Sequence, residues 1–290
     1  MKKSRISWTS YTWNPVHGCS KVSEGCRHCY AERISLERGF TKKPWTEPNS
    51  TDNVLLKPHK LNEPDKIAQP SMIFVNSMSD LFHGMIPDRY IIRVCEVMSR
   101  NREHIFQILT KRPERARFFH WPPTDLFLKP GRWPSHVWLG TSAEDQRSAN
   151  ERIPHLTRSF AQVRFLSIEP MLDWIILEDI PEARQLDWII VGGESEGASR
   201  RREMSHNWVH PIRDFCLEHK IPFFFKQSSA HRTEIGKALR HEDGTYWSWQ
   251  QYPEDLRDPI QTSRHPHAHL EALSLDKARR LRRGLESKQA

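Results

Sequence analysis

Short apolar runs alternate with longer amphipathic stretches along most of the chain. Runs rich in β-branched and aromatic residues predict strands over residues 11–16, 72–76, 104–109, 136–140, 163–168, 186–191 and 221–225. Apolar residues at helical spacing between these runs predict helices over residues 88–100, 113–119, 144–156 and 206–219. This order of strand and helix predicts parallel βα units. About six or seven such units favour an α/β fold with a TIM-like (β/α) barrel, full or incomplete, over an open doubly wound sheet.

Two segments fall outside this pattern. Residues 41–70 are rich in Pro, Asn and Lys, which predicts an inserted loop near the mouth of the barrel. Apolar periodicity is then lost near the C-terminus, so we expect a barrel domain over residues 1–250 and a C-terminal extension, helical or partly disordered, over residues 251–290. Three alternating histidines in the extension are interpreted as surface residues: His265, His267 and His269.

Each predicted strand ends in small or polar residues. These ends are Asn76–Asp80, Thr110–Arg112, Gly140–Ser142, Ser167–Pro170, Gly192–Ser195 and Lys226–Gln227. Exposed loops are polar in any fold, so a single strand end of this kind carries little weight. In a βα barrel, however, these ends converge on one mouth, where active sites are built. Six polar ends beside a metal motif therefore favour a functional site there.

The metal motif consists of Cys19, Cys26 and Cys29, which fall within eleven residues at the spacing C-x6-C-x2-C. Thiolates bind iron and zinc, and two cysteines separated by two residues can reach one centre from a single turn. Three thiolates are one short of a closed tetrahedral site. An iron–sulfur cluster would keep one iron open, whereas structural zinc would require a fourth ligand, for which His17 and His28 are the candidates. Three plain reduced thiols are the third alternative.

The other two cysteines differ from the motif. Cys95 and Cys216 are isolated among apolar residues at helical spacing, so we expect them to be buried. Five cysteines in this distribution do not form a disulfide framework, and a reducing compartment suits metal ligation. The chain has no apolar run of membrane-spanning length, and its first residues lack the apolar stretch of a signal peptide. These features predict a cytoplasmic protein without a membrane partner.

Six segments together carry a family resemblance: Gly18–Glu32, Ser77–Phe82, Leu109–Arg112, Ser167–Pro170, Val191–Ser195 and Phe223–Gln227. Over about residues 6–255 the chain resembles the phage-associated three-Cys-motif family of uncharacterised proteins. That family is similar in layout to radical S-adenosylmethionine enzymes, whose partial TIM barrel carries a three-cysteine loop that holds a [4Fe–4S] cluster. The resemblance implies two cofactors, the [4Fe–4S] cluster and S-adenosylmethionine, together with a reductase or other redox donor.

In such an enzyme, Cys19, Cys26 and Cys29 would bind three irons, and the open iron would chelate S-adenosylmethionine for one-electron cleavage to a 5′-deoxyadenosyl radical. The cofactor's ammonium needs a carboxylate, and its carboxylate needs a cation. The candidates for the first contact are Asp80, Glu169 and Glu194, and those for the second are Lys111, Arg112 and Lys226. Gly192 and Gly193 would let the backbone approach a ligand, although a glycine pair also marks an ordinary turn.

The chain departs from the radical-enzyme pattern at three places. The first cysteine gap is six residues instead of three, and His28 replaces the aromatic residue expected before the last cysteine. The Gly-Gly-Glu expected after the second strand occurs instead at residues 192–194, on a much later strand. Residues 226–230 read Lys-Gln-Ser-Ser-Ala where Trp-Gly is expected after the Gln. The departures leave the chemistry of the metal open.

A different class of function is a zinc-binding, nucleic-acid-binding protein of phage or mobile-element origin without redox chemistry. The net charge of +8 and two basic runs, Arg200–Arg202 and Lys277–Arg283, favour contacts with phosphates, although such runs are also common on solvated surfaces. Trp247 and Trp249 lie in a hairpin predicted to turn at Asp243–Gly244. The two functions are compatible, because a radical enzyme could act on a nucleic acid or nucleotide. The substrate itself cannot be read from the sequence.

Overall fold

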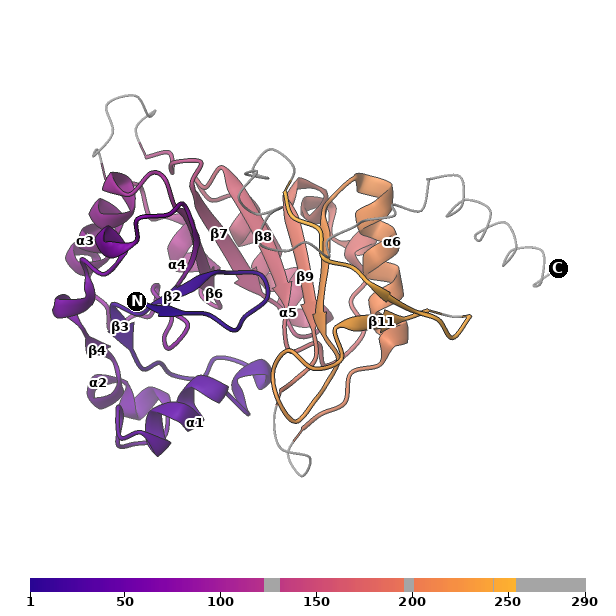
Figure 1. Ribbon diagram of the computed structural model, residues 1–290, viewed down its shortest axis with the longest axis horizontal. Helices are drawn as coiled ribbons and strands as arrows, with labels where there is room; N and C mark the ends of the chain where they lie inside the picture. The colour runs from indigo at the N-terminus through magenta and orange to yellow at the C-terminus, as the bar shows by residue number, and fades with distance from the viewer. Residues whose placement is uncertain (123–130, 196–200, 242, 254–290) are drawn as a thin grey trace.

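The computed structural model describes residues 1–122, 131–195, 201–241 and 243–253 (Figure 1). Seven parallel strands follow one another in sequence order across one sheet: β2 (Tyr11–Trp13), β5 (Met72–Val75), β6 (Ile105–Thr110), β7 (Val137–Ser142), β8 (Val163–Ile168), β9 (Trp188–Gly192) and β10 (Phe223–Gln227). A short strand, β1 (Lys2–Lys3), pairs antiparallel with β2. The sheet is open, with β1 and β10 as its two edges, and it curls into a half-barrel (Figure 1). The predicted TIM-like barrel is therefore confirmed in its incomplete form.

The main helices follow the strands as the pattern predicted: α3 (Asp88–Arg100), α4 (Pro113–Arg117), α5 (Gln146–Thr157) and α6 (Val209–His219). They follow β5, β6, β7 and β9, while β8 is followed by two 3-10 turns, η5 (Leu177–Asp179) and η6 (Pro181–Gln185). In Figure 1, α3 and α4 lie toward one end of the curled sheet and α6 toward the other. The 3-10 turn η7 (His206–Trp208) accounts for the first residues of the predicted helix 206–219. As expected, Cys95 in α3 and Cys216 in α6 are buried.

The two faces of the sheet differ in what covers them. The helices pack against one face through the large apolar core. The other face carries a second cluster of buried residues: Trp8, Met72, Phe74, Trp138, Phe165, Trp188, Ile190 and Phe224. Met72, Trp138, Phe165, Trp188 and Phe224 lie in the amino-terminal halves of their strands, and Trp8 packs on the cluster with its ring 4.8 Å from that of Phe74. Tyr252 closes the cluster over Trp188. The aromatic packing leaves the polar carboxyl ends of the strands to build a site.

The predicted first strand is interrupted, which is a difference from the sequence pattern. Residues 11–16 contain β2 and the first residue of β3 (Val16–His17), separated by Asn14 and Pro15. Proline has no N–H for a ladder, and Asn14 bonds instead to Ser77 Oγ and Met78 N at 3.1 and 2.9 Å. The chain therefore leaves the sheet before it reaches the cysteines.

The segment predicted as an inserted loop, residues 41–70, holds short elements only: η2 (Glu47–Asn49), α2 (Ser50–Asn53), β4 (Leu55–Leu56), η3 (Pro58–Lys60) and η4 (Pro64–Lys66). Strand β4 pairs antiparallel with β3, so the insert supports the residues just before Cys19. Gly18 has φ +85°, and a Cβ there would lie 1.8 Å from the carbonyl oxygen of Asn53. Only glycine fits this turn into the cysteine loop.

Near the end of the described residues, β11 (Ala238–Arg240) and β12 (Tyr246–Ser248) form a hairpin, which confirms the hairpin expected around Asp243–Gly244. Most of the predicted C-terminal extension, including the three alternating histidines and the basic run 277–283, lies outside the described residues. The division into a barrel domain and an extension stays a prediction. Within the described ranges, the structure contains no helix that is both long and apolar enough to span a bilayer.

Candidate metal and cofactor site

The three cysteines of the motif lie on one continuous loop at the carboxyl ends of the strands. Cys19 follows β3, Cys26 ends the 3-10 turn η1 (Glu24–Cys26), and Cys29 is the N-cap residue of α1 (Tyr30–Glu37). All three are free and partly exposed.

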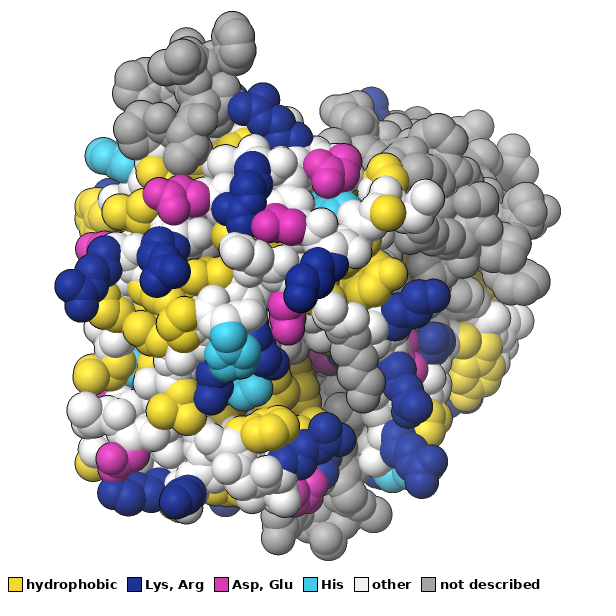
Figure 2. Space-filling model, turned by 60° about the vertical axis from the view of Figure 1, so that its left-hand side comes forward, with side chains coloured by type: hydrophobic (Ala, Val, Ile, Leu, Met, Phe, Trp, Pro, Cys, Tyr) yellow, Lys and Arg dark blue, Asp and Glu magenta, His cyan; other side chains and the backbone are white. Residues whose placement is uncertain are grey.

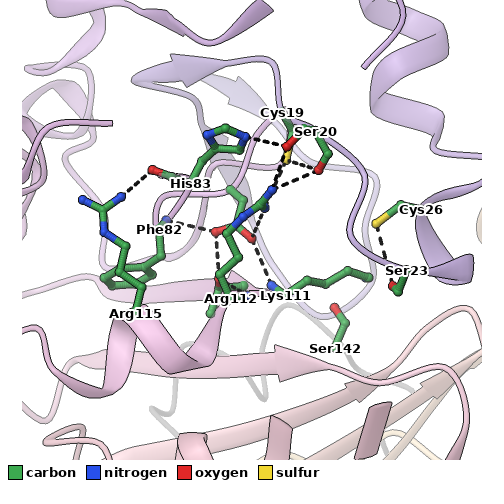
Figure 3. Close-up of polar contacts among 12 residues, drawn as sticks. Cys19, Ser20, Ser23, Cys26, Phe82, His83, Lys111, Arg112, Arg115 and Ser142 are labelled. Atoms are coloured by element: carbon green, nitrogen blue, oxygen red, sulfur yellow. Dashed lines mark hydrogen bonds and ion pairs between the residues drawn. The ribbon is translucent and has the colours of Figure 1, made fainter. Parts of the chain in front are cut away.

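Arg112, which follows β6, holds the first part of this loop (Figure 3). Its Nη1 donates to Oδ2 of Asp80 at 3.2 Å and reaches the sulfur of Cys19 at 3.5 Å. Its Nη2 donates to the carbonyl oxygen and the hydroxyl of Ser20 at 3.1 and 3.0 Å. Arg112 is only 9% exposed. Its guanidinium is therefore committed to partners inside the protein.

Asp80 is equally committed. Its Oδ1 accepts from Phe82 N at 2.9 Å and from Thr110 Oγ1 at 2.7 Å. Its Oδ2 accepts from Lys111 N at 3.0 Å as well as from Arg112. A carboxylate has about four lone-pair sites, and all four are filled. Asp80 therefore joins the loop after β5 to the end of β6.

Ser20 is the meeting point of a second group of polar side chains. Its hydroxyl accepts from Arg112, donates to Glu47 and lies 2.8 Å from Nε2 of His83. Because Nδ1 of His83 accepts from Met85 N at 3.1 Å, the proton belongs on Nε2, which donates to Ser20. A histidine in this tautomer cannot take a proton from the serine. The group therefore positions the loop and does not resemble an activated nucleophile.

Glu144, just beyond β7, supports the middle of the cysteine loop. A Cβ on Gly25 would lie 2.9 Å from Oε2 of Glu144, so the loop backbone rests directly on this carboxylate. Arg152 of α5 donates to the same oxygen at 3.0 Å and to the carbonyl oxygen of Ser142 at 2.8 Å. Both charged side chains are buried. The Glu144–Arg152 pair therefore supports η1.

Glu194, two residues beyond β9, anchors the end of the loop. Its Oε2 lies 3.2 Å from Nδ1 of His28 and accepts from Arg202 N at 2.9 Å. Arg202 also forms an ion pair with Oε1 of Glu194 and donates to the carbonyl oxygen of Glu24 at 3.1 Å. Burial alone would raise the pKa of Glu194, but the bonds from Arg202 and His28 outweigh it and lower that pKa. Glu194 is thus an ionised anchor for both sides of the turn.

Lys111 differs from its neighbour Arg112 in having a free charge. Figure 3 shows its side chain extending toward the side of the loop that carries Cys26, near Ser142. In the described part of the chain, Lys111 has no carboxylate within ion-pair distance. The cation is therefore available to an anionic ligand.

Glu169 and Lys226 form an ion pair across the ends of β8 and β10. Tyr30, which begins α1 directly after Cys29, donates from its hydroxyl to the carbonyl oxygen of Ser77 at 2.8 Å. Glu169 directly follows β8, and Lys226 lies near the end of β10, so both belong to the carboxyl ends of the strands. The Glu169–Lys226 pair thus lies on the same mouth as the cysteines.

The Gly192–Gly193 pair has a structural role in this fold. A Cβ on Gly193 would lie 2.3 Å from Ser229 N, so the glycine lets the loop after β10 pack against β9. A Cβ on Gly192 would meet Glu169 and Lys226 at 3.5 Å, an ordinary contact distance. Close approach of a ligand to these two glycines stays a prediction.

Within the described residues, no group of three or more Cys, His, Asp and Glu side chains has the geometry of a metal site. The chemistry of the donors nevertheless fits a soft metal, because three free thiols share one loop and an arginine N–H faces one sulfur. Burial, with Asp80, raises the pKa of Cys19 to about 12. Binding would therefore release thiol protons, as metal ligation requires.

The two histidines considered for zinc lie in different settings. His17 is buried, and burial together with Lys60 and Lys57 lowers its pKa to about 4, so it is neutral near pH 7. His28 is bonded to Glu194 through Nδ1. A carboxylate on one ring nitrogen is the usual partner of a histidine whose other nitrogen binds metal. Of the two, His28 has the more suitable arrangement.

Most of the described side chains considered for nucleic-acid binding have partners within the protein. Arg202 is paired with Glu194, and Arg201 with Glu203. Trp249 is buried, and Nε1 of Trp249 bonds to His241. On the face drawn in Figure 2, Lys and Arg side chains are interspersed with acidic and apolar ones. Arg200 and the run 277–283 lie outside the described ranges.

The family described as "Protein of unknown function (DUF5131)" matches residues 3–255. The chain belongs to this family. No curated protein matches it. Among solved structures it is similar to "Spore photoproduct lyase complexed with dinucleoside spore photoproduct", with 8% sequence identity and a TM-score of 0.45. That match covers 73% of this chain and 62% of the other, and so distant a likeness carries no argument about activity.

The match to DUF5131 confirms the prediction that the chain belongs to an uncharacterised family. The predicted association of that family with phages stays a prediction. Sequence reasoning placed the cysteines and the polar strand ends at one mouth, and the structure brings Cys19, Asp80 and Arg112 into contact. Sequence reasoning did not identify three other residues of the site: Ser20, His83 and Glu144. Glu144 follows the same rule of polar strand ends and could have been found. Ser20 and His83 carry no comparable signal in the sequence.

Proposed function

We propose that this protein is an iron–sulfur enzyme of the radical S-adenosylmethionine type, in which Cys19, Cys26 and Cys29 hold a [4Fe–4S] cluster. One observation carries the proposal. The cysteine loop is fixed to the carboxyl ends of three parallel strands by Arg112, Glu144 and Glu194 while its three thiols stay free. A loop that is held in place at a barrel mouth and offers three cysteine thiols suits a cluster with one open iron.

The described contacts divide the candidate cofactor residues into two groups. Asp80, Arg112 and Glu194 have partners within the protein, which makes them supports of the loop. Lys111 has a free charge on the side of the loop that carries Cys26 and is the best candidate for the carboxylate of S-adenosylmethionine. Glu169 and Lys226, which pair with each other across the ends of β8 and β10, are the candidates kept for its ammonium and its carboxylate. When bound, the cluster would supply the electron that cleaves the cofactor to methionine and a 5′-deoxyadenosyl radical.

The substrate proposed is a nucleic acid or nucleotide, on the support of the net charge of +8. The electron would come from a reductase or another redox donor. Such a cluster suits the reducing cytoplasm, where we place the protein. Origin in a phage or another mobile element belongs to the same proposal, and the gene neighbourhoods of family members would test it.

A zinc protein is the second candidate, and the contact of His28 with Glu194 favours it. Zinc would take the three thiolates and Nε2 of His28, giving a closed structural site without redox chemistry. Such a protein would bind nucleic acid only through its surface.

Anaerobic reconstitution with iron and sulfide, followed by visible absorption and metal analysis, separates the two candidates. We expect one [4Fe–4S] cluster per chain, and 5′-deoxyadenosine when S-adenosylmethionine and a strong one-electron reductant are added. Cys26→Ser should lose both, whereas Cys95→Ala, at a buried position in α3, should keep both. One tightly bound zinc per chain with no uptake of iron would overturn the iron–sulfur proposal.

A further inference from the structure

The contacts of Arg112 point to a role that differs from ligand binding. Two of its donor groups make four contacts with the protein, to Asp80, Cys19 and both oxygens of Ser20. The only sulfur among these acceptors belongs to the first cysteine of the motif. The guanidinium fork is therefore aimed at a metal ligand and lies beside it.

Asp80 fixes Arg112 in this position. The carboxylate is itself held by backbone N–H groups of Phe82 and Lys111 and by the hydroxyl of Thr110, so it cannot turn away. The exposed fractions of the two side chains are 8% for Asp80 and 11% for Arg112. A buried pair of opposite charges, rigidly held, lies next to Cys19.

We propose that the Asp80–Arg112 pair positions Cys19 and sets the reduction potential of the metal centre, Arg112 raising that potential and Asp80 lowering it. The inference rests on the proposed iron–sulfur function and deepens it. Reduction adds negative charge to a cluster, so a nearby cation and an N–H bond to sulfur stabilise the reduced form. A nearby carboxylate has the opposite effect, and water screens neither charge fully at this depth.

Removal of the two charges should shift the reduction potential in opposite directions. A pair with a purely structural role would not produce opposite shifts. Arg112→Gln leaves the charge of Asp80 uncompensated beside the sulfur, so the potential should shift to more negative values. Asp80→Asn leaves the charge of Arg112 uncompensated, so the potential should shift to more positive values. Arg112→Lys keeps the charge but loses the fork, and its potential should lie between those of the wild type and Arg112→Gln.

The test is a redox titration monitored by electron paramagnetic resonance on the reconstituted full-length protein, without S-adenosylmethionine. Iron and sulfide content is measured for each variant. Arg158→Gln, in a surface pair with Glu182, is the control and should match the wild type. Leaving out the cofactor separates this role from cofactor binding, because an arginine that only held the cofactor's carboxylate would not change this potential.

Opposite shifts for Arg112→Gln and Asp80→Asn would support the inference. Unchanged potentials, or shifts in the same direction, would overturn it. If Arg112→Gln cannot hold the cluster, the other two variants decide: a more negative potential for Arg112→Lys and a more positive one for Asp80→Asn would support the inference. A wild-type protein that takes up no iron would overturn the proposed function itself, whereas a wild-type cluster with unmoved potentials in the variants would overturn this inference alone.

Discussion

Nδ1 of His28 lies 3.2 Å from Oε2 of Glu194, which joins the cysteine loop to the end of β9 across 166 residues of sequence. The same carboxylate accepts three bonds from Arg202. Arg202 reaches on to Glu24, so one acidic side chain holds both sides of the turn that carries Cys26. The loop is therefore ordered by a charged contact that forms only when the barrel is assembled.

Glu194→Gln should destabilise the fold and loosen this turn. The amide is uncharged and brings N–H groups toward donors that need acceptors, so we expect a loss of about 1.5–3 kcal/mol in the free energy of unfolding. Urea denaturation near neutral pH measures it. Glu178→Gln is the matched control, because Glu178 pairs with Arg184 at the surface and should cost less than about 1 kcal/mol. Equal losses in the two variants would contradict the anchoring role.

How much of this site could be read from the sequence depends on which contact is considered. The rule that parallel strands end at one edge brought Asp80, Arg112 and Glu194 to the right mouth. Their roles could not be assigned, because the partners that decide them lie far away in the chain. Asp80 and Arg112 are 32 residues apart, and His28 is 166 residues from Glu194. Hydrophobic periodicity contains no information on such pairings.

The strands show the same limit at a smaller scale. Apolar runs located all seven parallel strands, because burial on both faces selects β-branched and aromatic residues. The break at Asn14 and Pro15 was missed, since it depends on the side chain of Asn14 meeting Ser77 and Met78. That break is what turns the chain from the sheet into the metal loop.

The adjacent glycines Gly192 and Gly193 should respond differently to alanine. Gly193→Ala drives a methyl group into the backbone at Ser229, and overpacking of this kind costs about 1–3 kcal/mol. Gly192→Ala makes only ordinary contacts, so its free energy of unfolding should change by less than about 0.5 kcal/mol. Thermal and urea unfolding compare the two. If Gly192→Ala were the more damaging change, the packing role assigned to Gly193 would be wrong.

Asp65 predicts a pH dependence of stability at the insert. Burial alone would raise its pKa, but bonds from Arg100 and Asn101 outweigh it, and the pKa lies below its ordinary value. A carboxyl with a lowered folded pKa adds stability above its unfolded pKa of about 3.9, and this stability is lost as the pH falls through the folded value. The group is more than a third exposed, so the contribution is small.

Asp65→Asn should therefore be less stable than the wild type by about 0.5 kcal/mol near neutral pH, because solvent screens the pair. The difference should shrink as the pH falls from about 4 through the lower pKa of the folded carboxyl, because the unfolded chain is protonated there before the folded protein is. Urea denaturation of both proteins at several pH values gives the difference directly. A difference that grows toward acid pH would show that the bonds to Arg100 and Asn101 do not favour the ionised form.

The buried pair of Glu144 and Arg152 should be far more sensitive than the exposed ones. Glu144→Gln leaves the guanidinium of Arg152 buried without a counter-ion, which costs about 3–5 kcal/mol. Replacing both residues, as Glu144→Gln with Arg152→Met, removes the unpaired charge and should recover much of that loss. Because Gly25 rests on Glu144, the single variant should also expose the cysteine loop to protease more than the double variant does. Urea unfolding and limited proteolysis of the three proteins test this, and a double variant less stable than Glu144→Gln would show that the pair supports the loop by more than its charge balance.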